Sequence, residues 1–381
     1  MTRILSIIGT RPEGIKMAPV IRELSRHPDA FESIVAVTGQ HDQLLRQVLD
    51  LFSIRPDFDL AAMKPNQDLC DLAARILSGI RGVLQESEPD FILVQGDTAT
   101  VFAASIAAFY RRVRIGHVEA GLRTSDKSEP FPEEMHRLLT DQMSDLLFAP
   151  TEGNRRNLLA EGLPDEKIHV TGNTIVDALL EISAPAMLPP ISELSDLEEP
   201  FVLITAHRRE NFGAPFQKIF HAIRRLAELH PHVQFVYPVH PNPNVRSAAF
   251  QTLSGRKNIR LIQPLDYLSF LHLMKKCRII MSDSGGVQEE APSFHKPLLV
   301  LRDKTERSEL IEAGGAKLVG CNQELIIREA SRLLREDEYY RRMSDIRNPF
   351  GDGTASRKIV KILLEAMPEE RKWKTRNCIA S

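Results

Sequence analysis

The sequence lacks the features that mark several special classes of protein. Its 381 residues include only four cysteines, none in a C-x-x-C pair, so neither a disulfide framework nor a zinc site is predicted. The formal net charge of −2 gives no electrostatic reason to expect a nucleic acid or an anionic membrane as a partner. No segment approaches the roughly 18 consecutive apolar residues of a membrane span. Aromatic residues make up 6% of the chain, and the twelve histidines show no metal-ligand spacing with Asp, Glu or Cys.

These absences leave an ordinary globular protein with about a quarter of its residues charged. The first apolar run is short and is followed at once by charged residues, so we interpret it as a strand and not as a signal peptide. We therefore expect a cytoplasmic protein that binds neither membrane nor nucleic acid. The length predicts two domains, each large enough to bury its own core.

Short β-branched or apolar runs alternate with segments whose apolar residues are spaced by three and four. This alternation predicts βαβ units and mostly parallel sheets. A segment with several prolines, 183–200, divides the pattern into two halves and is interpreted as a linker. The expected fold is α/β, with two Rossmann-type doubly wound domains and a ligand cleft between them. The expected strands are Arg3–Ile8, Ser33–Thr38, Phe91–Gln95, Arg114–His117, Leu146–Ala149, Lys167–Thr171, Phe201–Thr205, Val233–Val239, Ile259–Ile262, Arg278–Ser282, Pro297–Leu301 and Lys317–Val319.

Three acids in the first half, Asp97, Glu119 and Glu133, stand at strand ends or at a helix start beside predicted anion-binding turns. Acids repel phosphate, so their presence there indicates proton chemistry on the group attached to a phosphate. Each acid alone has a structural alternative. Asp97 could cap a helix, Glu119 could pair with Arg123, and Glu133 could stabilise a first helical turn that Pro132 introduces.

The first strand is followed by Gly9-Thr10-Arg11-Pro12-Glu13-Gly14-Ile15-Lys16. Glycine permits a tight turn, the next helix offers unpaired N–H groups, and Arg11 and Lys16 add positive charge, so this turn is a candidate phosphate site. It is neither a G-x-G-x-x-G fingerprint nor a Walker loop, which disfavours nicotinamide and P-loop functions. An ordinary basic surface turn is the alternative.

The second half contains a basic turn and a glycine-rich turn, each directly after an expected strand. His207, Arg208 and Arg209 suit a pyrophosphate, although a surface basic turn would look the same. Ser284-Gly285-Gly286 opens a helix and resembles an anion nest, and Glu290 lies where a carboxylate could bind a ribose diol. The anion nest and the ribose-binding carboxylate of Glu290 together predict a nucleotide site. Arg302 and Arg307 could close over the same ligand, and His240 is more typical of a packed loop histidine.

Several long motifs occur in a fixed order: GTRPEGIKMAPV, GDT, HVEAGLRT, PFPEE, AHRREN, SDSGGVQEEAP, LRDKTER and the closing GDGTASRKIVKILLE. In this combination the chain, over roughly residues 3–366, resembles the non-hydrolysing UDP-N-acetylglucosamine 2-epimerases.

The resemblance implies a GT-B-like fold with domains at 1–172 and 173–352, a helix at 353–367 that crosses back to the first domain, and a polar tail at 368–381. It implies reversible interconversion of UDP-GlcNAc and UDP-ManNAc through elimination of UDP to 2-acetamidoglucal and re-addition, without a cofactor. It also implies a homodimer, often activated by a second UDP-GlcNAc, that supplies ManNAc-type precursors for cell-surface polysaccharide.

The resemblance also assigns roles by motif position. Asp97, Glu119 and Glu133 match the acid/base residues of the family, and which acid handles which proton stays open. The matching cations are Arg11, Lys16 and His207. The matching UDP contacts are Ser284, Gly285, Gly286, Glu290 and Arg307, with Phe270 near the uracil. The activator site would include Gln40, His41, Gln43, Gln67, Arg208 and His240.

The sequence departs from the family pattern at four places, none of which removes a catalytic group. Asn66 replaces a common basic residue before Gln67, and Ser128-Glu129 replaces a usual Tyr-Ser pair. These two put activator dependence and the preference for the sugar substituents in doubt. Gln95 stands where His is usual before GDT, and Ser308 where Pro is common.

Three other functions remain open at this point. A hydrolysing relative would release ManNAc and UDP if water reached the glucal. A GT-B glycosyltransferase would also place UDP on a glutamate of the second domain, but it needs an acceptor groove in place of the acids. A nucleotide-sugar sensor has no need for three acids.

Overall fold

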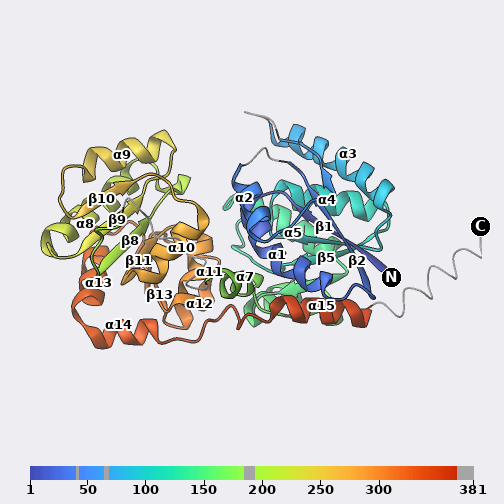
Figure 1. Ribbon diagram of the computed structural model, residues 1–381. Coiled ribbons are helices and arrows are strands. Elements are labelled where there is room, and N and C mark those ends of the chain that lie inside the picture. The colour runs from blue at the N-terminus through green and yellow to red at the C-terminus, as the bar shows by residue number, and fades with distance from the viewer. Residues whose placement is uncertain (40–42, 64–67, 184–193, 367–381) are drawn as a thin grey trace, which may run out of the picture. The chain divides into compact units, whose positions relative to one another are not determined.

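The computed structural model describes residues 1–39, 43–63, 68–183 and 194–366 (Figure 1). Its contacts divide the chain into unit 1, Met1–Ala178 with Phe350–Ser381, and unit 2, Leu179–Pro349. The boundaries expected from the sequence, after 172 and after 352, differ from this division by a few residues. Of the expected linker, residues 184–193 lie outside the described ranges.

Unit 1 contains a seven-stranded parallel sheet in the order β3-β2-β1-β4-β5-β6-β7. Its strands are β1 (Thr2–Ile8), β2 (Phe31–Val37), β3 (Phe58–Asp59), β4 (Phe91–Gln95), β5 (Arg114–Val118), β6 (Leu146–Ala149) and β7 (Ile168–Val170). Its helices are α1 (Arg11–Ser25), α2 (Gln43–Leu51), α3 (Leu69–Ser87), α4 (Ala99–Tyr110), α5 (Glu133–Met143), α6 (Glu152–Ala160), α7 (Thr174–Ile182, which runs into unit 2) and α15 (Ala355–Ala366), with a 3₁₀ turn at Asp165–Lys167.

The core of unit 1 forms because its strands are apolar on both faces, as parallel sheets covered by helices require. All five residues of β4 are buried. Apolar side chains of α3 and α4, including Ile76, Ile80 and Val101, pack with those of β1, β4 and β5. Since β1 lies between β2 and β4, the strand order reverses there, and the loops after β1 and β4 open at the switch point where such sheets bind ligands.

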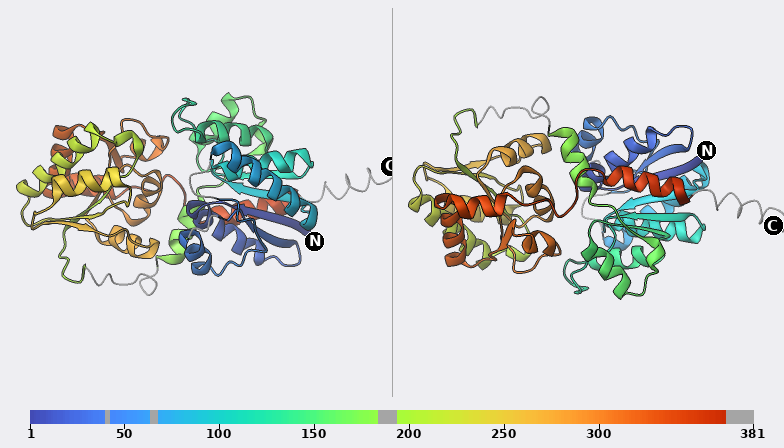
Figure 2. Two further views of the ribbon diagram at one scale, coloured as in Figure 1. Left: turned by 90° about the horizontal axis from the view of Figure 1, so that it is seen from above. Right: turned by 90° about the horizontal axis from the view of Figure 1, so that it is seen from below.

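Helix α15 returns the chain to unit 1 after unit 2, and it contacts α1 (Figure 2). The carboxylate of Asp177 accepts hydrogen bonds from the backbone N–H groups of Ala355 and Ser356, at 3.2 and 2.8 Å. The Ser356 hydroxyl donates to the same carboxylate at 2.6 Å. A side chain from another helix therefore satisfies the first N–H groups of α15.

Unit 2 repeats the plan with a six-stranded parallel sheet in the order β10-β9-β8-β11-β12-β13. Its core includes Phe216, Phe220 and Tyr237, which are fully buried. Its strands are β8 (Phe201–Thr205), β9 (Gln234–Pro238), β10 (Ile259–Ile262), β11 (Ile279–Ser282), β12 (Leu298–Val300) and β13 (Ala316–Leu318). Its helices are α8 (Ala214–Leu229), α9 (Pro243–Leu253), α10 (Tyr267–Lys276), α11 (Gly285–Glu290), α12 (Ser308–Glu312), α13 (Gln323–Arg335) and α14 (Asp337–Ser344), with 3₁₀ turns at Arg209–Asn211 and Ala291–Phe294.

Every strand expected from the sequence is present to within a few residues. The short edge strand β3 was not predicted, because two residues are too few to show an alternating pattern. Within the described ranges, no helix is both long and apolar enough to cross a membrane.

Candidate functional site

Two of the three predicted acids of unit 1, and the predicted cation Arg11, come directly after neighbouring strands. Arg11 follows β1, Asp97 follows β4 and Glu119 follows β5, and these three strands are adjacent in the sheet. Their carboxyl ends meet at one edge, so the three turns are brought together by the topology of the sheet.

Glu119 forms a buried ion pair with Lys16 of α1. Lys16 Nζ lies 2.6 Å from Glu119 Oε2, and the two residues are 7% and 6% exposed. Gln95 Nε2 donates to the same oxygen. Glu119 has a φ of +73°, a strained conformation for a residue with a side chain, of the kind found at functional sites. The alternative pairing of Glu119 with Arg123 is wrong, because Arg123 binds Asp141 and Glu161.

Asp97 points its carboxylate toward Arg137 of α5, with 3.5 Å between Oδ2 and the guanidinium. Its backbone carbonyl faces Nδ1 of His136 at 3.0 Å. The alternative in which Asp97 caps α4 is wrong, because the cap is Thr98, whose hydroxyl accepts from Val101 N–H. The Asp97 side chain is 29% exposed and is therefore accessible to a ligand.

Glu133 is the first residue of α5 and is half-buried. The next residue, Glu134, binds Arg137 and accepts from the backbone N–H groups of Thr124 and Ser125. Within the described ranges, the Glu133 carboxylate makes no hydrogen bond or ion pair. The PFPEE motif thus contains one acid with a structural role and one acid that has no partner among the described residues.

Glu13, which we did not single out from the sequence, is the best-enclosed acid of the first turn. It is 2% exposed. Its carboxylate accepts from Gly9 N–H at 2.5 Å, from the Thr98 hydroxyl at 2.7 Å and from the Thr10 hydroxyl at 3.0 Å. Burial raises the pKa of Glu13 to about 7; the three donors oppose this shift, and the charge of Asp97 adds to it. Glu13 therefore joins the turn after β1 to the turn after β4.

Arg11, beside Glu13, is half-buried. Within the described ranges its guanidinium makes no hydrogen bond or ion pair. A cation on a phosphate-type turn without a protein partner is suited to binding an anionic ligand.

A second buried network joins the turns after β4 and β5. His117 Nδ1 lies 2.6 Å from Asp141 Oδ1, and His117 Nε2 lies 2.7 Å from the carbonyl oxygen of Gly96. Both ring nitrogens of His117 therefore face oxygen acceptors, a carboxylate and a backbone carbonyl. Asp141 also accepts from Gly121 N–H and from Arg123. Burial by itself would raise the pKa of Asp141, but His117 and Arg123 outweigh it and hold that pKa below its usual range. Asp141 carried no signal in the sequence, since it lies inside an ordinary amphipathic helix.

In unit 2 the turn after β8 is organised by Asp283, a fully buried residue that follows β11. Its carboxylate accepts from the backbone N–H groups of His207 and Arg208 at 2.9 Å each, and from Asn211 Nδ2 at 2.9 Å. His207 Nδ1 lies 3.6 Å from the same carboxylate. The ring of His207 stacks on that of His240, with centroids 5.3 Å apart. The adjacent strands β8 and β11 thus bring the AHRREN and SDSGG motifs into contact.

Both arginines predicted to close over a ligand are held by carboxylates of unit 2. Arg307 binds Glu289 at 2.7 Å and also Glu306, and Arg302 binds Glu306 at 3.0 Å and Glu210 at 2.7 Å. The two guanidinium groups outweigh the effect of burial and hold the pKa of Glu306 far below its usual range. A Cβ on Gly285 would lie 2.7 Å from the Arg307 guanidinium, so a larger residue there would displace that guanidinium.

The predicted nucleotide residues of unit 2 lie around α11 and α10. The Glu290 carboxylate accepts from the Tyr267 hydroxyl at 2.8 Å, and Phe270 lies one turn further along α10, half-buried. Ser284 N–H donates to the Ser282 hydroxyl at 2.9 Å. Of the predicted nest, the first N–H groups of the helix, on Gly285 and Gly286, have no carbonyl partner within α11.

The predicted activator residues are covered only in part. Gln40, His41 and Gln67 lie outside the described residues, as does Asn66. Gln43 is the first residue of α2. Arg208 lies in the Asp283-bound turn, and His240 stacks against His207 in unit 2.

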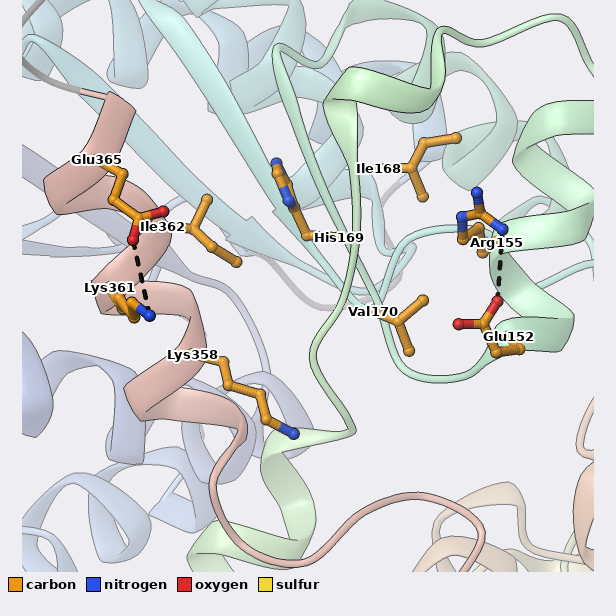
Figure 3. Close-up of a pocket in the computed structure, with 9 residues that line it drawn as sticks. All are labelled: Glu152, Arg155, Ile168, His169, Val170, Lys358, Lys361, Ile362 and Glu365. Carbon is orange, nitrogen blue, oxygen red and sulfur yellow. Dashed lines mark ion pairs between the residues drawn. The ribbon is translucent and has the colours of Figure 1, made fainter.

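A surface hollow of about 430 Å³ lies elsewhere in unit 1, between α15, β7 and α6 (Figure 3). None of the predicted site residues lines it. Its cations are largely compensated, since Arg155 pairs with Glu152 and Asp165, and Lys361 lies 3.8 Å from Glu365. The described part of the chain contains no cluster of three His, Cys, Asp or Glu residues that could hold a metal ion.

Comparisons with known proteins show to which family the chain is similar. Residues 22–364 match the family model described as UDP-N-acetylglucosamine 2-epimerase. The UDP-N-acetylglucosamine 2-epimerase of Escherichia coli (strain K12) is 48% identical over 369 residues, which cover 95% of this chain and 98% of that protein. The protein of that name from Yersinia pestis is also 48% identical over 369 residues, with the same coverage of both chains.

Solved structures of UDP-GlcNAc 2-epimerases also match the chain over nearly its whole length. The Neisseria meningitidis UDP-GlcNAc 2-epimerase bound to UDP-GlcNAc aligns with a TM-score of 0.91 and 47% identity, covering 96% of this chain and 100% of that one. The Methanocaldococcus jannaschii enzyme in complex with UDP-GlcNAc and UDP aligns with a TM-score of 0.83 and 34% identity, with coverage of 96% and 100%. The predicted α/β, GT-B-like fold with two Rossmann-like sheets is confirmed. With these matches over nearly its whole length, the chain belongs to the UDP-N-acetylglucosamine 2-epimerase family.

Proposed function

We propose that this chain is a non-hydrolysing UDP-GlcNAc 2-epimerase, which interconverts UDP-GlcNAc and UDP-ManNAc by elimination and re-addition of UDP. Membership of the family supports the substrate. The observation that carries the chemistry is the buried ion pair between Lys16 of α1 and Glu119, which lies on the turn next to that of Asp97. It combines a carboxylate for proton transfer with a cation for an anionic leaving group.

The reaction needs groups that act on both faces of the sugar. A base removes the proton from C2 while the C1–O bond breaks, UDP leaves with the bonding electrons, and a C1–C2 double bond forms. In the return step a UDP oxygen attacks C1 and a proton is delivered to the opposite face of C2. Removal from one face and delivery to the other require at least two acid/base groups, which Asp97, Glu119 and Glu133 can supply.

Other residues bind and stabilise UDP. Arg11, which has no partner within the described ranges, and Lys16 are the cations of unit 1, and His207 contributes from the turn that Asp283 holds. In unit 2 the N–H groups of Gly285 and Gly286, with Ser284, are proposed to bind phosphate, Glu290 the ribose diol, and Phe270 the uracil. Arg307 fixes this region through Glu289 and Glu306. No residue in this scheme requires a metal or an organic cofactor.

Proton NMR of the purified protein with UDP-GlcNAc in D₂O, without added metal or nicotinamide, tests the proposal. UDP-ManNAc with deuterium at C2 is the expected product. Free ManNAc with UDP would show the hydrolysing reaction, and no change in the presence of excess UDP-GlcNAc would contradict the assigned substrate. Glu119→Gln should still bind UDP and lose turnover, by about a hundredfold or more. Retained turnover in this variant would contradict the role of Glu119.

The remaining features implied by the family resemblance are proposals of the same kind. We propose a cytoplasmic homodimer whose product is a precursor for cell-surface polysaccharide, with a second UDP-GlcNAc bound as an activator near Arg208 and His240. A monomer in light scattering would contradict the dimer. Initial rates that depend hyperbolically on the concentration of UDP-ManNAc as substrate, and that are the same with and without added UDP-GlcNAc, would contradict activation.

A further inference from the structure

Gln95 is a buried side chain that donates a hydrogen bond to a residue proposed for catalysis. It is the last residue of β4 and is 3% exposed. Its Nε2 donates to Oε2 of Glu119, the oxygen that Lys16 Nζ also contacts. Two donors from different elements therefore meet on one oxygen of the Glu119 carboxylate.

The backbone that carries this contact is paired within the sheet. Gln95 pairs in register with Val118, the residue before Glu119, and Gly96 N–H donates to the Val118 carbonyl at 3.1 Å. An amide that projects from a paired strand is held more closely than one on a free loop. The backbone of Glu119 is in the left-handed region, with φ +73°, a strained conformation that surrounding contacts must hold in place.

The two donors differ in what they contribute. Lys16 brings a positive charge, and its flexible stem holds a point-like ammonium. Gln95 brings an N–H group of fixed direction and no charge. We propose that Gln95 is a positioning residue that sets the direction of the Glu119 carboxylate without changing the net charge of the site.

This inference rests on the proposed function, since it assigns Gln95 a task in the chemistry of Glu119. Two near-isosteric variants separate its effects. Gln95→Met removes the donor and keeps the volume. Gln95→Glu keeps the shape and sets a second carboxylate against Glu119, and repulsion between two adjacent carboxylates raises the pKa of one of them.

In Gln95→Met we expect kcat to fall about tenfold or more, because a misdirected base transfers protons poorly, while KM and the affinity for UDP stay within about twofold. In Gln95→Glu we expect the acidic limb of the kcat–pH profile to move upward by about one unit or more. Gln85→Met, at an exposed position of α3, is the matched control and should keep the wild-type kcat. The assays are initial rates of epimerisation from pH 5 to 10, calorimetric titration with UDP, and thermal unfolding.

The outcomes distinguish a failure of this inference from a failure of the proposed function. Absence of turnover in the wild type would contradict the proposed function. Wild-type turnover with an unchanged kcat in Gln95→Met, or an unshifted pH profile in Gln95→Glu, would overturn the role of Gln95 alone. A loss of kcat accompanied by an equal loss of UDP affinity and a lower unfolding temperature would also overturn it, because that pattern indicates a structural role.

Discussion

The buried carboxyl group of Glu13 makes the stability of unit 1 dependent on pH in a direction opposite to that of most carboxylates. Its pKa rises from 4.5 to about 7 on folding, with burial as the main cause. The folded chain therefore holds a proton that the unfolded chain releases. Stability from this group is fully present below pH 4.5 and is lost as the pH rises from there through about 7.

The magnitude follows from the shift. One pKa unit corresponds to about 1.4 kcal/mol, so a change of about 2.5 units amounts to about 3 kcal/mol between the two limits. Glu13→Gln removes the titration and imitates the protonated acid, since the amide NH₂ can face the hydroxyls of Thr10 and Thr98, which rotate to accept. The free energy of unfolding of the variant minus that of the wild type should therefore increase by about 3 kcal/mol between pH 4.5 and pH 8.

Urea denaturation followed by circular dichroism at several pH values measures this difference. Glu86→Gln on the exposed surface of α3 is the matched control, and its difference from the wild type should not vary with pH. A constant difference for Glu13→Gln across the whole range would refute the reasoning. So would a variant that loses stability relative to the wild type as the pH rises.

Two further predictions concern unit 2. Gly285→Ala should lower the free energy of unfolding by about 1–3 kcal/mol, because the added Cβ meets the Arg307 guanidinium at 2.7 Å, whereas Gly286→Ala has no atom within 4 Å of its Cβ and should cost much less. Chemical denaturation of the pair measures this, and equal losses would contradict the contact. Asp283→Asn should weaken UDP binding about tenfold, because the amide cannot accept from every donor of the His207 turn, and calorimetric titration that shows wild-type affinity would count against the role of that turn.

Much of the fold was predictable because parallel strands that are buried on both faces consist of continuous runs of apolar residues. The runs 91–95 and 201–205 are the strands β4 and β8 at the expected bounds. Placing the acids on strand-end turns also followed from the sequence, because the strands of parallel sheets all end at one edge. The family was identifiable from the order of the long motifs alone.

The partners of the site residues were not predictable in the same way. Spacing along a helix or turn suggested Arg123 for Glu119, but the true cation is Lys16, 103 residues away in the chain. Asp97 was a plausible cap, and the cap is its neighbour Thr98. Local sequence patterns describe only neighbours up to one helical turn away. The ion-pair partner of Glu119 and the cap of α4 depended instead on which side chain the folded chain brought close.

The sequence by itself therefore determined the class of fold, the family and the set of turns on which the chemistry is proposed to occur. Only the tertiary structure decided how the acids are held. It brought Glu13 into hydrogen bonds with the turns after β1 and β4, and Gln95 into a hydrogen bond with Glu119. It also fixed the His207 turn through Asp283, 76 residues further along the chain. The reason is physical: a buried polar group must find its partner, and that partner is supplied by the packing of strands distant in sequence.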